Sequence, residues 1–105
     1  MHVRLLTIEE WERLASEADF RPAKMASKLS VSPRQLQRLF RHQFQLPPSR
    51  WLRLLQCRLS KELVGLGLSN KETAHKLNFS NDCHFCREFK KCYGDSPQKF
   101  SPARP

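Results

Sequence analysis

The stretch Ala74–Phe100 reads AHKLNFSNDCHFCREFKKCYGDSPQKF, and it repeats the pattern of Ala26–Trp51, which reads ASKLSVSPRQLQRLFRHQFQLPPSRW. The two stretches align at an offset of 48 residues up to Val31 and Phe79, and at an offset of 49 beyond them. The aligned pairs are Ala26/Ala74, Leu29/Leu77, Leu36/Phe85, Arg38/Arg87, Phe40/Phe89, Gln45/Gly94, Pro48/Pro97 and Trp51/Phe100. Such a repeat indicates that the chain uses one structural unit twice.

The first copy predicts two short helices joined by a tight turn. The first helix is expected over Pro22–Lys28, and the turn at residues 29–31. Ser32 has the side chain of an N-cap and Pro33 suits the first helical position, so the second helix begins there and ends near Gln43. Gln45 then lies where the chain is expected to leave this helix in the left-handed conformation.

The second copy carries the same signals. Ser69 and Glu72 have the spacing of a capping box, which predicts the start of a helix. Asn78 is one of the few residues that tolerate a positive φ, and it lies at the predicted turn. The second helix of this copy is expected to restart at Ser80 or Asn81.

Helices are also predicted outside the two copies. Thr7 and Glu10 form another capping box, and the apolar stripe that follows is expected in the core: Ile8, Trp11, Leu14, Ala15 and Ala18. Pro48–Val64 has apolar residues at helical spacing and reads as a linker helix that Gly65 and Gly67 end. Ser96–Phe100 predicts a last short helix. Since no strand pattern occurs, we expect an all-α fold of about seven helices.

Charge is distributed unevenly along the 105 residues. The chain has 19 Lys and Arg against 10 Asp and Glu, a net charge of +9. Residues 1–20 contain five acidic against two basic residues, so residues 21–105 carry a net charge of +12. A basic excess of this size favours a polyanion as ligand, because Lys and Arg placed on phosphates release condensed counterions. Charge alone would also allow a membrane surface or an acidic protein.

The sequence predicts a cytoplasmic location. Its first residues, Met1–Leu6, are too short for a signal peptide, and no apolar run approaches the roughly 18–20 residues that cross a bilayer. The cysteines are therefore expected to be reduced thiols: Cys57, Cys83, Cys86 and Cys92.

The C-terminal copy contains the motif Phe85-x-x-x-Phe89-Lys90-Lys91-x-Tyr93-Gly94-x-Ser96-Pro97-x-x-Phe100. Together with two helix-turn-helix units joined by a central helix, it resembles the DNA-binding domain of AraC/XylS transcriptional regulators. The resemblance covers about residues 8–101 and implies one domain over residues 1–105. Its parts are a first helix-turn-helix at about 8–45, the linker helix at about 48–64 and a second helix-turn-helix at about 69–101. The sequence departs from the family at Gln45, Gln56, Asn78 and Ser101, where Gly, Arg, Gly and Arg are usual.

The resemblance implies that two recognition helices, at about 32–43 and 81–91, enter successive major grooves of double-stranded DNA. One chain then reads both half-sites, so the domain is expected to be monomeric on its site. Transcription would be regulated by recruiting RNA polymerase or by occluding a promoter, in the nucleoid.

The resemblance also assigns DNA contacts. In the first recognition helix the expected base readers are Arg34, Gln37 and Arg38, residue types that bind base edges. The matching positions in the second helix are Asp82, Cys83, Cys86 and Arg87. Only Arg87 is a strong reader, so the second half-site is expected to be read more loosely, partly through DNA shape. The residues expected on the DNA backbone are Ser32, Arg41, Ser80, Asn81, Lys90 and Lys91.

Two other hypotheses compete with this one. A redox- or metal-responsive DNA-binding sensor would act through Cys83, Cys86 and Cys92. The spacing disfavours zinc, because no second Cys-x-x-Cys or His pair completes a tetrahedral set, and we expect no metal and no cofactor. A protein-interaction module would use Leu54 and Cys57, which lie off the main apolar stripe of the linker helix.

An enzyme is not expected. The sequence has neither a Gly-rich phosphate loop nor a Ser/His/Asp arrangement nor paired pocket carboxylates. The chain is also too short for the effector-binding or dimerisation domain of larger family members. It is expected to be either a short regulator or the DNA-binding end of a longer one.

Overall fold

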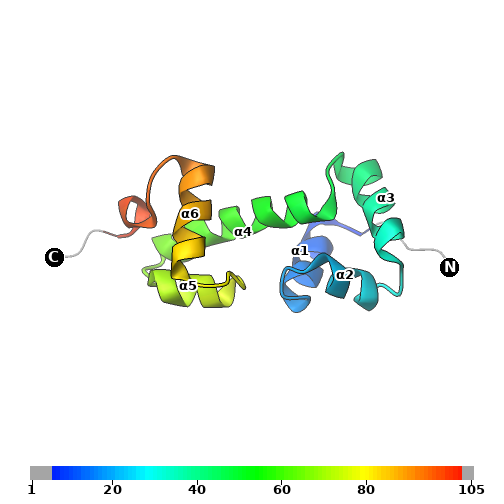
Figure 1. Cartoon of the computed structure of the whole chain (residues 1–105), viewed down its shortest axis with the longest axis horizontal. Coiled ribbons are helices and arrows are strands. Elements are labelled where there is room, and N and C mark those ends of the chain that lie inside the picture. Colours follow the sequence, from blue (N-terminus) through cyan, green and yellow to red (C-terminus); the bar gives the residue numbers. More distant parts are fainter. Residues whose placement is uncertain (1–5, 103–105) are drawn as a thin grey trace. The chain divides into compact units, whose positions relative to one another are not determined.

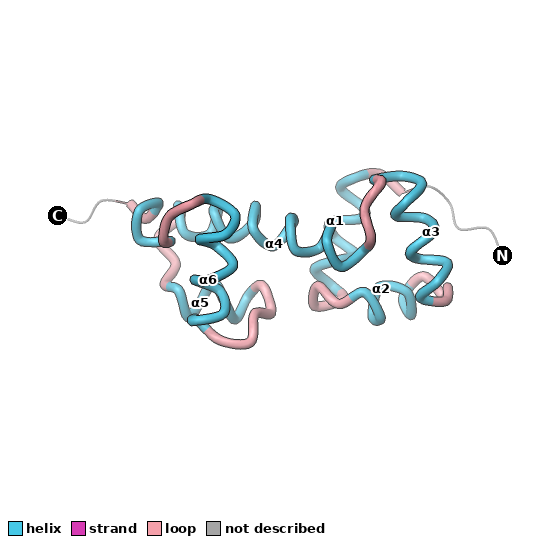
Figure 2. The backbone as a smooth tube through the Cα atoms, turned by 45° about the horizontal axis from the view of Figure 1, so that its top comes forward, coloured by secondary structure: helices cyan, strands magenta, loops and turns pink. Residues whose placement is uncertain are grey.

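Helices make up all the regular structure of residues 6–102, the part of the chain that the computed structural model describes (Figures 1 and 2). They are α1 (Ile8–Glu17), α2 (Pro22–Lys28), α3 (Pro33–Phe44), α4 (Pro48–Gly65), α5 (Asn70–Lys76), α6 (Asp82–Tyr93) and the 3-10 helix η1 (Pro97–Phe100). The predicted all-α class is confirmed. The expectation about a signal peptide concerns Met1–Leu6, of which residues 1–5 lie outside the described part.

The chain divides into two compact units, residues 1–53 and 54–105, and the boundary falls within α4. Figure 1 shows α1, α2 and α3 in one unit and α5, α6 and η1 in the other. Each unit is described by itself below. That the whole chain acts as one DNA-binding domain stays a prediction.

Each unit contains a helix-turn-helix pair, and the two turns match bond for bond. The amide of Val31 donates to the carbonyl of Ala26 over 3.0 Å, and that of Phe79 donates to the carbonyl of Ala74 over 2.9 Å. Both turns pass through a residue of positive φ, Ser30 at 57° and Asn78 at 61°. The repeat in the sequence is therefore a repeat in structure, and Asn78 adopts the predicted conformation.

The second helices of the two pairs, α3 and α6, are both 12 residues long. The Oγ of Ser32 accepts the amide of Gln35 over 3.1 Å, which begins α3. Asn81 begins α6, because its Oδ1 accepts the amide of His84 over 2.7 Å. Ser80 is thus the extra residue that raises the offset from 48 to 49.

Matching aromatic clusters form the cores of the units. In the first unit the ring of Phe40 lies 5.2 Å from the rings of both Phe44 and Trp51. In the second unit Phe89 lies 4.8 Å from Tyr93 and 5.3 Å from Phe100. Phe40 and Phe89, at the same position of the repeat, are fully buried. Each cluster ties the C-terminal half of α3 or α6 to the segment that opens with Pro48 or Pro97.

Helix α1 packs in the first unit through one face. Trp11 is buried, and its Nε1 donates to the Oε1 of Gln43 over 3.2 Å, while the Nε2 of Gln43 donates to the carbonyl of Leu6 over 3.1 Å. The prediction was wrong for Ile8, which is 59% exposed. Ile8 is the first residue of the helix and lies one turn before the residue that packs on α3.

Helices α3 and α6 both end in a left-handed residue at the same position of the repeat, Gln45 at φ 56° and Gly94 at φ 80°. Gly adopts this conformation without cost, whereas a residue with a Cβ loses about 1 kcal/mol. Replacing Gln45 by Gly is therefore expected to stabilise the first unit by about 1 kcal/mol and to raise the melting temperature by about 4–8 °C. Thermal unfolding followed by circular dichroism measures this change.

Gln45→Ala is the matched control. Both substitutions remove the bond from the Nε2 of Gln45 to the carbonyl of His42, 3.2 Å long, but Ala keeps the Cβ. Only the Gly variant should gain stability. An equal or lower melting temperature for the Gly variant would show that the left-handed backbone is not the cause.

Candidate nucleic-acid interface

The α3 helix presents one polar, basic face. Its buried side consists of Leu36 and Phe40. All the side chains predicted to contact DNA from this helix are exposed: Arg34, Gln37, Arg38 and Arg41. Within residues 6–102, none of these four forms a hydrogen bond or ion pair with another side chain. This face offers free guanidinium and amide groups, which are the groups that bind base edges and phosphates.

The corresponding face of α6 is less basic. Helix α3 contains no acidic residue, whereas α6 carries Asp82 and Glu88 against Arg87, Lys90 and Lys91. Arg87 and Lys90 are exposed, and Asp82 is half-buried. The field at α3 therefore attracts a phosphate backbone more strongly than the field at α6.

The two cysteines predicted as base readers differ in their surroundings. Cys83 is exposed, while Cys86 is half-buried and its Sγ accepts a hydrogen bond from the Nδ2 of Asn70 over 3.3 Å. Burial raises the pKa of the Cys86 thiol, and the negative charge of Asp82 raises it further. Cys86 thus faces α5 in part, and its thiol stays protonated at neutral pH.

The residues predicted on the DNA backbone lie at the two ends of the helices. Ser32 and Asn81 are N-caps: the hydroxyl oxygen of Ser32 accepts the amide of Gln35, and the Oδ1 of Asn81 accepts the amide of His84. The amide of Ser80 donates to the Nδ1 of His84 over 3.4 Å. At the other end, Lys90 and Lys91 are both exposed, and the Nζ of Lys91 lies 3.4 Å from the Oε2 of Glu88, whose side chain is 16% exposed. An ion pair formed by so exposed a lysine is weak.

Gln56 positions the second turn, a role that the sequence did not reveal. It is buried in α4, and its Nε2 donates to the carbonyl of Leu77 over 2.7 Å, at the C-terminal end of α5. The bond satisfies a helix-end carbonyl that would otherwise be buried without a partner. Gln56 was visible only as a departure from the usual Arg, because its partner lies 21 residues away.

The cysteines correct two expectations. Cys57 and Cys92 form a disulfide, so they are not reduced thiols, and Cys83 and Cys86 are the free cysteines. Leu54 is 52% exposed as expected, but Cys57 is only 4% exposed, because it lies against the end of α6 and not on the outer face of α4. The sensor hypothesis used Cys83, Cys86 and Cys92 together. Cys92 is instead bonded to Cys57, which leaves Cys83 and Cys86 as the free thiols.

Nowhere in residues 6–102 do three or more His, Cys, Asp or Glu side chains gather as ligands for a metal ion. No helix there is long and apolar enough to cross a membrane.

Two helix-turn-helix pairs, each with a capped and exposed second helix, define the class of helix-turn-helix DNA-binding proteins. The profile of the family described as "Helix-turn-helix domain" matches residues 25–102. The chain belongs to this family, in its AraC type, whose members are DNA-binding transcription regulators and not enzymes. Domains of this type bind double-stranded DNA.

Solved structures share the fold. The C-terminal domain of the two-component response regulator yesN from Fusobacterium nucleatum is 24% identical, with 90% of this chain and 97% of that chain covered and a TM-score of 0.74. A transcriptional regulator with an AraC-type DNA-binding domain from Chromobacterium violaceum is 22% identical, with 89% and 87% covered and a TM-score of 0.73. The C-terminal domain of AraT, a response regulator from Geobacillus stearothermophilus, is 24% identical, with 88% and 77% covered and a TM-score of 0.75. The comparison with proteins of curated function gave no significant match.

Proposed function

We propose that this chain binds double-stranded DNA sequence-specifically and regulates transcription by inserting α3 and α6 into successive major grooves. The observation that carries the proposal is the exposed face of α3, where three Arg side chains and Gln37 have no partner among residues 6–102. An α-helix fits the major groove of B-DNA, and Arg and Gln bind guanine and adenine there through two hydrogen bonds each.

Base contacts divide unequally between the two helices. Arg34, Gln37 and Arg38 read the first half-site from α3. In α6, Arg87 is the main reader and Cys83 makes an apolar contact, while Asp82 accepts from cytosine N4. Cys86 contributes least to base contact, because it is half-buried against Asn70. The second half-site is therefore read more loosely, partly through DNA shape.

Backbone contacts fix the register of both helices. Arg41, Lys90 and Lys91 lie in the last turns of the recognition helices and carry charge toward phosphate. Ser32, Ser80 and Asn81 lie at the first turns, where helix amides and small polar groups meet a phosphate oxygen. The domain binds as a monomer, in the compartment that holds the chromosome. It regulates transcription by recruiting RNA polymerase or by occluding a promoter.

Selection of bound sequences from a pool of random duplexes tests the proposal. We expect enrichment of a two-part sequence, and an affinity for the enriched duplex at least 10³-fold above that for a shuffled duplex of equal composition, which is roughly the ratio for specific regulators. A variant with Arg34, Gln37 and Arg38 replaced by Ala is the control and should enrich nothing. Binding without enrichment of any sequence would contradict the proposal.

Lys90 provides a separate test of a phosphate contact. Replacing Lys90 by Ala is expected to weaken binding to the enriched and the shuffled duplex by the same factor, because a phosphate carries no sequence information. The slope of log affinity against log salt concentration should fall by about one. Binding curves at several salt concentrations on both duplexes measure the two effects.

Lys99→Ala is the matched control, since Lys99 is an exposed lysine of η1 that we do not assign to DNA. Its salt slope should equal that of the parent. A Lys90 variant that loses affinity only for the enriched duplex would place Lys90 on a base.

A further inference from the structure

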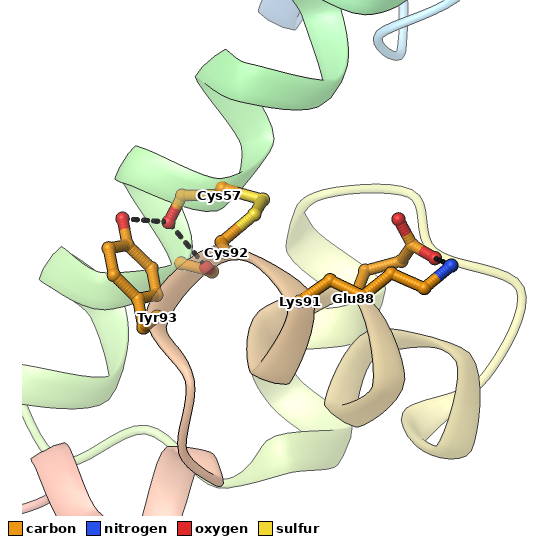
Figure 3. The surroundings of a disulfide bond; sticks show 6 residues. Cys57, Glu88, Lys91, Cys92 and Tyr93 are labelled. Carbon is orange, nitrogen blue, oxygen red and sulfur yellow. Dashed lines mark hydrogen bonds and ion pairs between the residues drawn. A yellow bond between two sulfur atoms is a disulfide. The ribbon is translucent and has the colours of Figure 1, made fainter.

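A disulfide joins the middle of α4 to the end of α6. Cys57 lies in α4 and Cys92 is the residue before the last of α6, with 6.4 Å between their Cα atoms (Figure 3). The bond closes a loop with a sequence separation of 35, which contains α5 and nearly all of α6. It is therefore the covalent link that holds the second recognition helix on α4.

Non-covalent contacts hold the same two positions together. The hydroxyl of Tyr93, next to Cys92, donates to the carbonyl of Cys57 over 2.9 Å. Burial raises the pKa of Tyr93, so the hydroxyl stays protonated and keeps donating. The Nζ of Lys61 lies over the rings of Tyr93 and Phe100, at 5.1 and 5.5 Å. These contacts do not require the S–S bond, so the two sulfurs stay close after its reduction.

The two cysteines differ in exposure. Cys57 is only 4% exposed, whereas Cys92 is exposed. We therefore expect an incoming thiolate to attack the Sγ of Cys92, with Cys57 as the leaving group. A disulfide that is open to attack on one side and held in register on the other can open and close reversibly.

We propose that the Cys57–Cys92 pair is a redox latch that sets the affinity of the second recognition helix for DNA. The proposal rests on the proposed function, because a DNA-binding regulator works where the chromosome is, and disulfides in reducing compartments are in most cases transient. The closed latch fixes the end of α6 and lowers the cost of ordering it on DNA. The open latch leaves that end held by non-covalent contacts, among them those of Tyr93 with Cys57 and Lys61.

The chemistry is exchange with a low-molecular-weight thiol–disulfide couple, of which glutathione is the probe. In opening, a glutathione thiolate attacks the Sγ of Cys92, the S–S bond breaks, and the Cys57 thiolate leaves and takes up a proton. A second glutathione thiolate then attacks the glutathione sulfur of the mixed disulfide and releases Cys92. Two thiols are formed in the protein and one oxidised glutathione outside it, so electrons and atoms balance. Closing is the reverse.

The first experiment does not involve DNA. A Cys83→Ser/Cys86→Ser variant, in which Cys57 and Cys92 are the only cysteines left, is equilibrated in glutathione buffers of graded potential, and its thiols are counted by alkylation and mass. We expect the number of free thiols per chain to change reversibly between two in reducing buffer and none in oxidising buffer. With Cys57→Ser added, Cys92 should capture glutathione, and with Cys92→Ser added, Cys57 should not. The latch would be overturned if the two thiols never formed a disulfide, or if the disulfide never opened. Equal capture of glutathione by Cys57 and Cys92 would also overturn it.

The second experiment measures DNA affinity of the parent chain on its enriched duplex, in oxidised and in reduced buffer. We expect the oxidised form to bind at least threefold more tightly and to melt roughly 10 °C higher. Cys57→Ser/Cys92→Ser should bind like the reduced parent in both buffers. Equal affinity of the two parent forms would overturn the proposal, and so would a redox response that survives in the double variant, since Cys83 and Cys86 would then be its source. Should neither form enrich a sequence, the proposed function fails, and the thiol counts still show whether the latch exists.

Discussion

Replacement of Arg38 by Ala is expected to weaken binding to the best duplex by about 1–3 kcal/mol, roughly 5- to 150-fold, and to change binding to a shuffled duplex much less. Arg38 is exposed on α3, on the side opposite Leu36 and Phe40. Its guanidinium is free to donate two hydrogen bonds to the O6 and N7 of a guanine, so its loss removes discrimination before it removes affinity. Titration of both duplexes with both proteins at one salt concentration measures the difference.

Arg41→Ala is the control on the same helix, because it distinguishes a contact to a base from a contact to a phosphate. Arg41 lies three residues further on and has the same charge and exposure, but we place it on phosphate. Its loss should weaken both duplexes alike. If Arg38→Ala did the same, the assignment of roles from helical phase would be wrong.

Replacement of Phe89 by Ala is expected to cost about 3–5 kcal/mol of stability, the usual range for a buried Phe. Phe89 is 1% exposed and packs against Phe85, Tyr93 and Phe100. A loss of this size is a large part of the stability of a small domain, so α5 and α6 should open in the second unit. The first unit has its own aromatic cluster and should keep its structure.

Amide hydrogen exchange measured by NMR locates the loss, and thermal unfolding gives its size. Protection should vanish in α5 and α6 and persist in α1 to α3. Leu54→Ala is the control in the same unit, because Leu54 is 52% exposed and its loss should stay within about 0.5 kcal/mol. Loss of protection in both units together would show that they unfold as one.

The features that the sequence predicted well depend on neighbouring residues. Capping boxes act over three residues, and the pairs Thr7/Glu10 and Ser69/Glu72 both form as expected. The left-handed conformation at Asn78 depends only on the tolerance of Asn itself for a positive φ. The internal repeat supplied the long-range order, because two copies of one pattern predict two copies of one turn.

The features that the sequence missed depend on partners far along the chain. Cys57 and Cys92 are 35 residues apart, and their spacing alone gives no pairing. Gln56 looked like a departure from a family pattern until its bond to Leu77 was seen. Helical periodicity also placed Ile8 in the core, although a helix's first turn can extend past the element that it packs on. Helical periodicity predicted the exposed face of α3. It did not predict how far Cys86 is buried against α5.

Chemical footprinting of guanine N7 on the selected duplex tests the central claim most directly, because N7 lies in the major groove. Our account predicts two protected segments, centred about 10 base pairs apart, since two recognition helices in successive major grooves are separated by one helical turn. Arg38→Ala should restore reactivity at a single guanine in one segment. Protection of one segment alone, or of minor-groove positions with N7 left reactive, would contradict it.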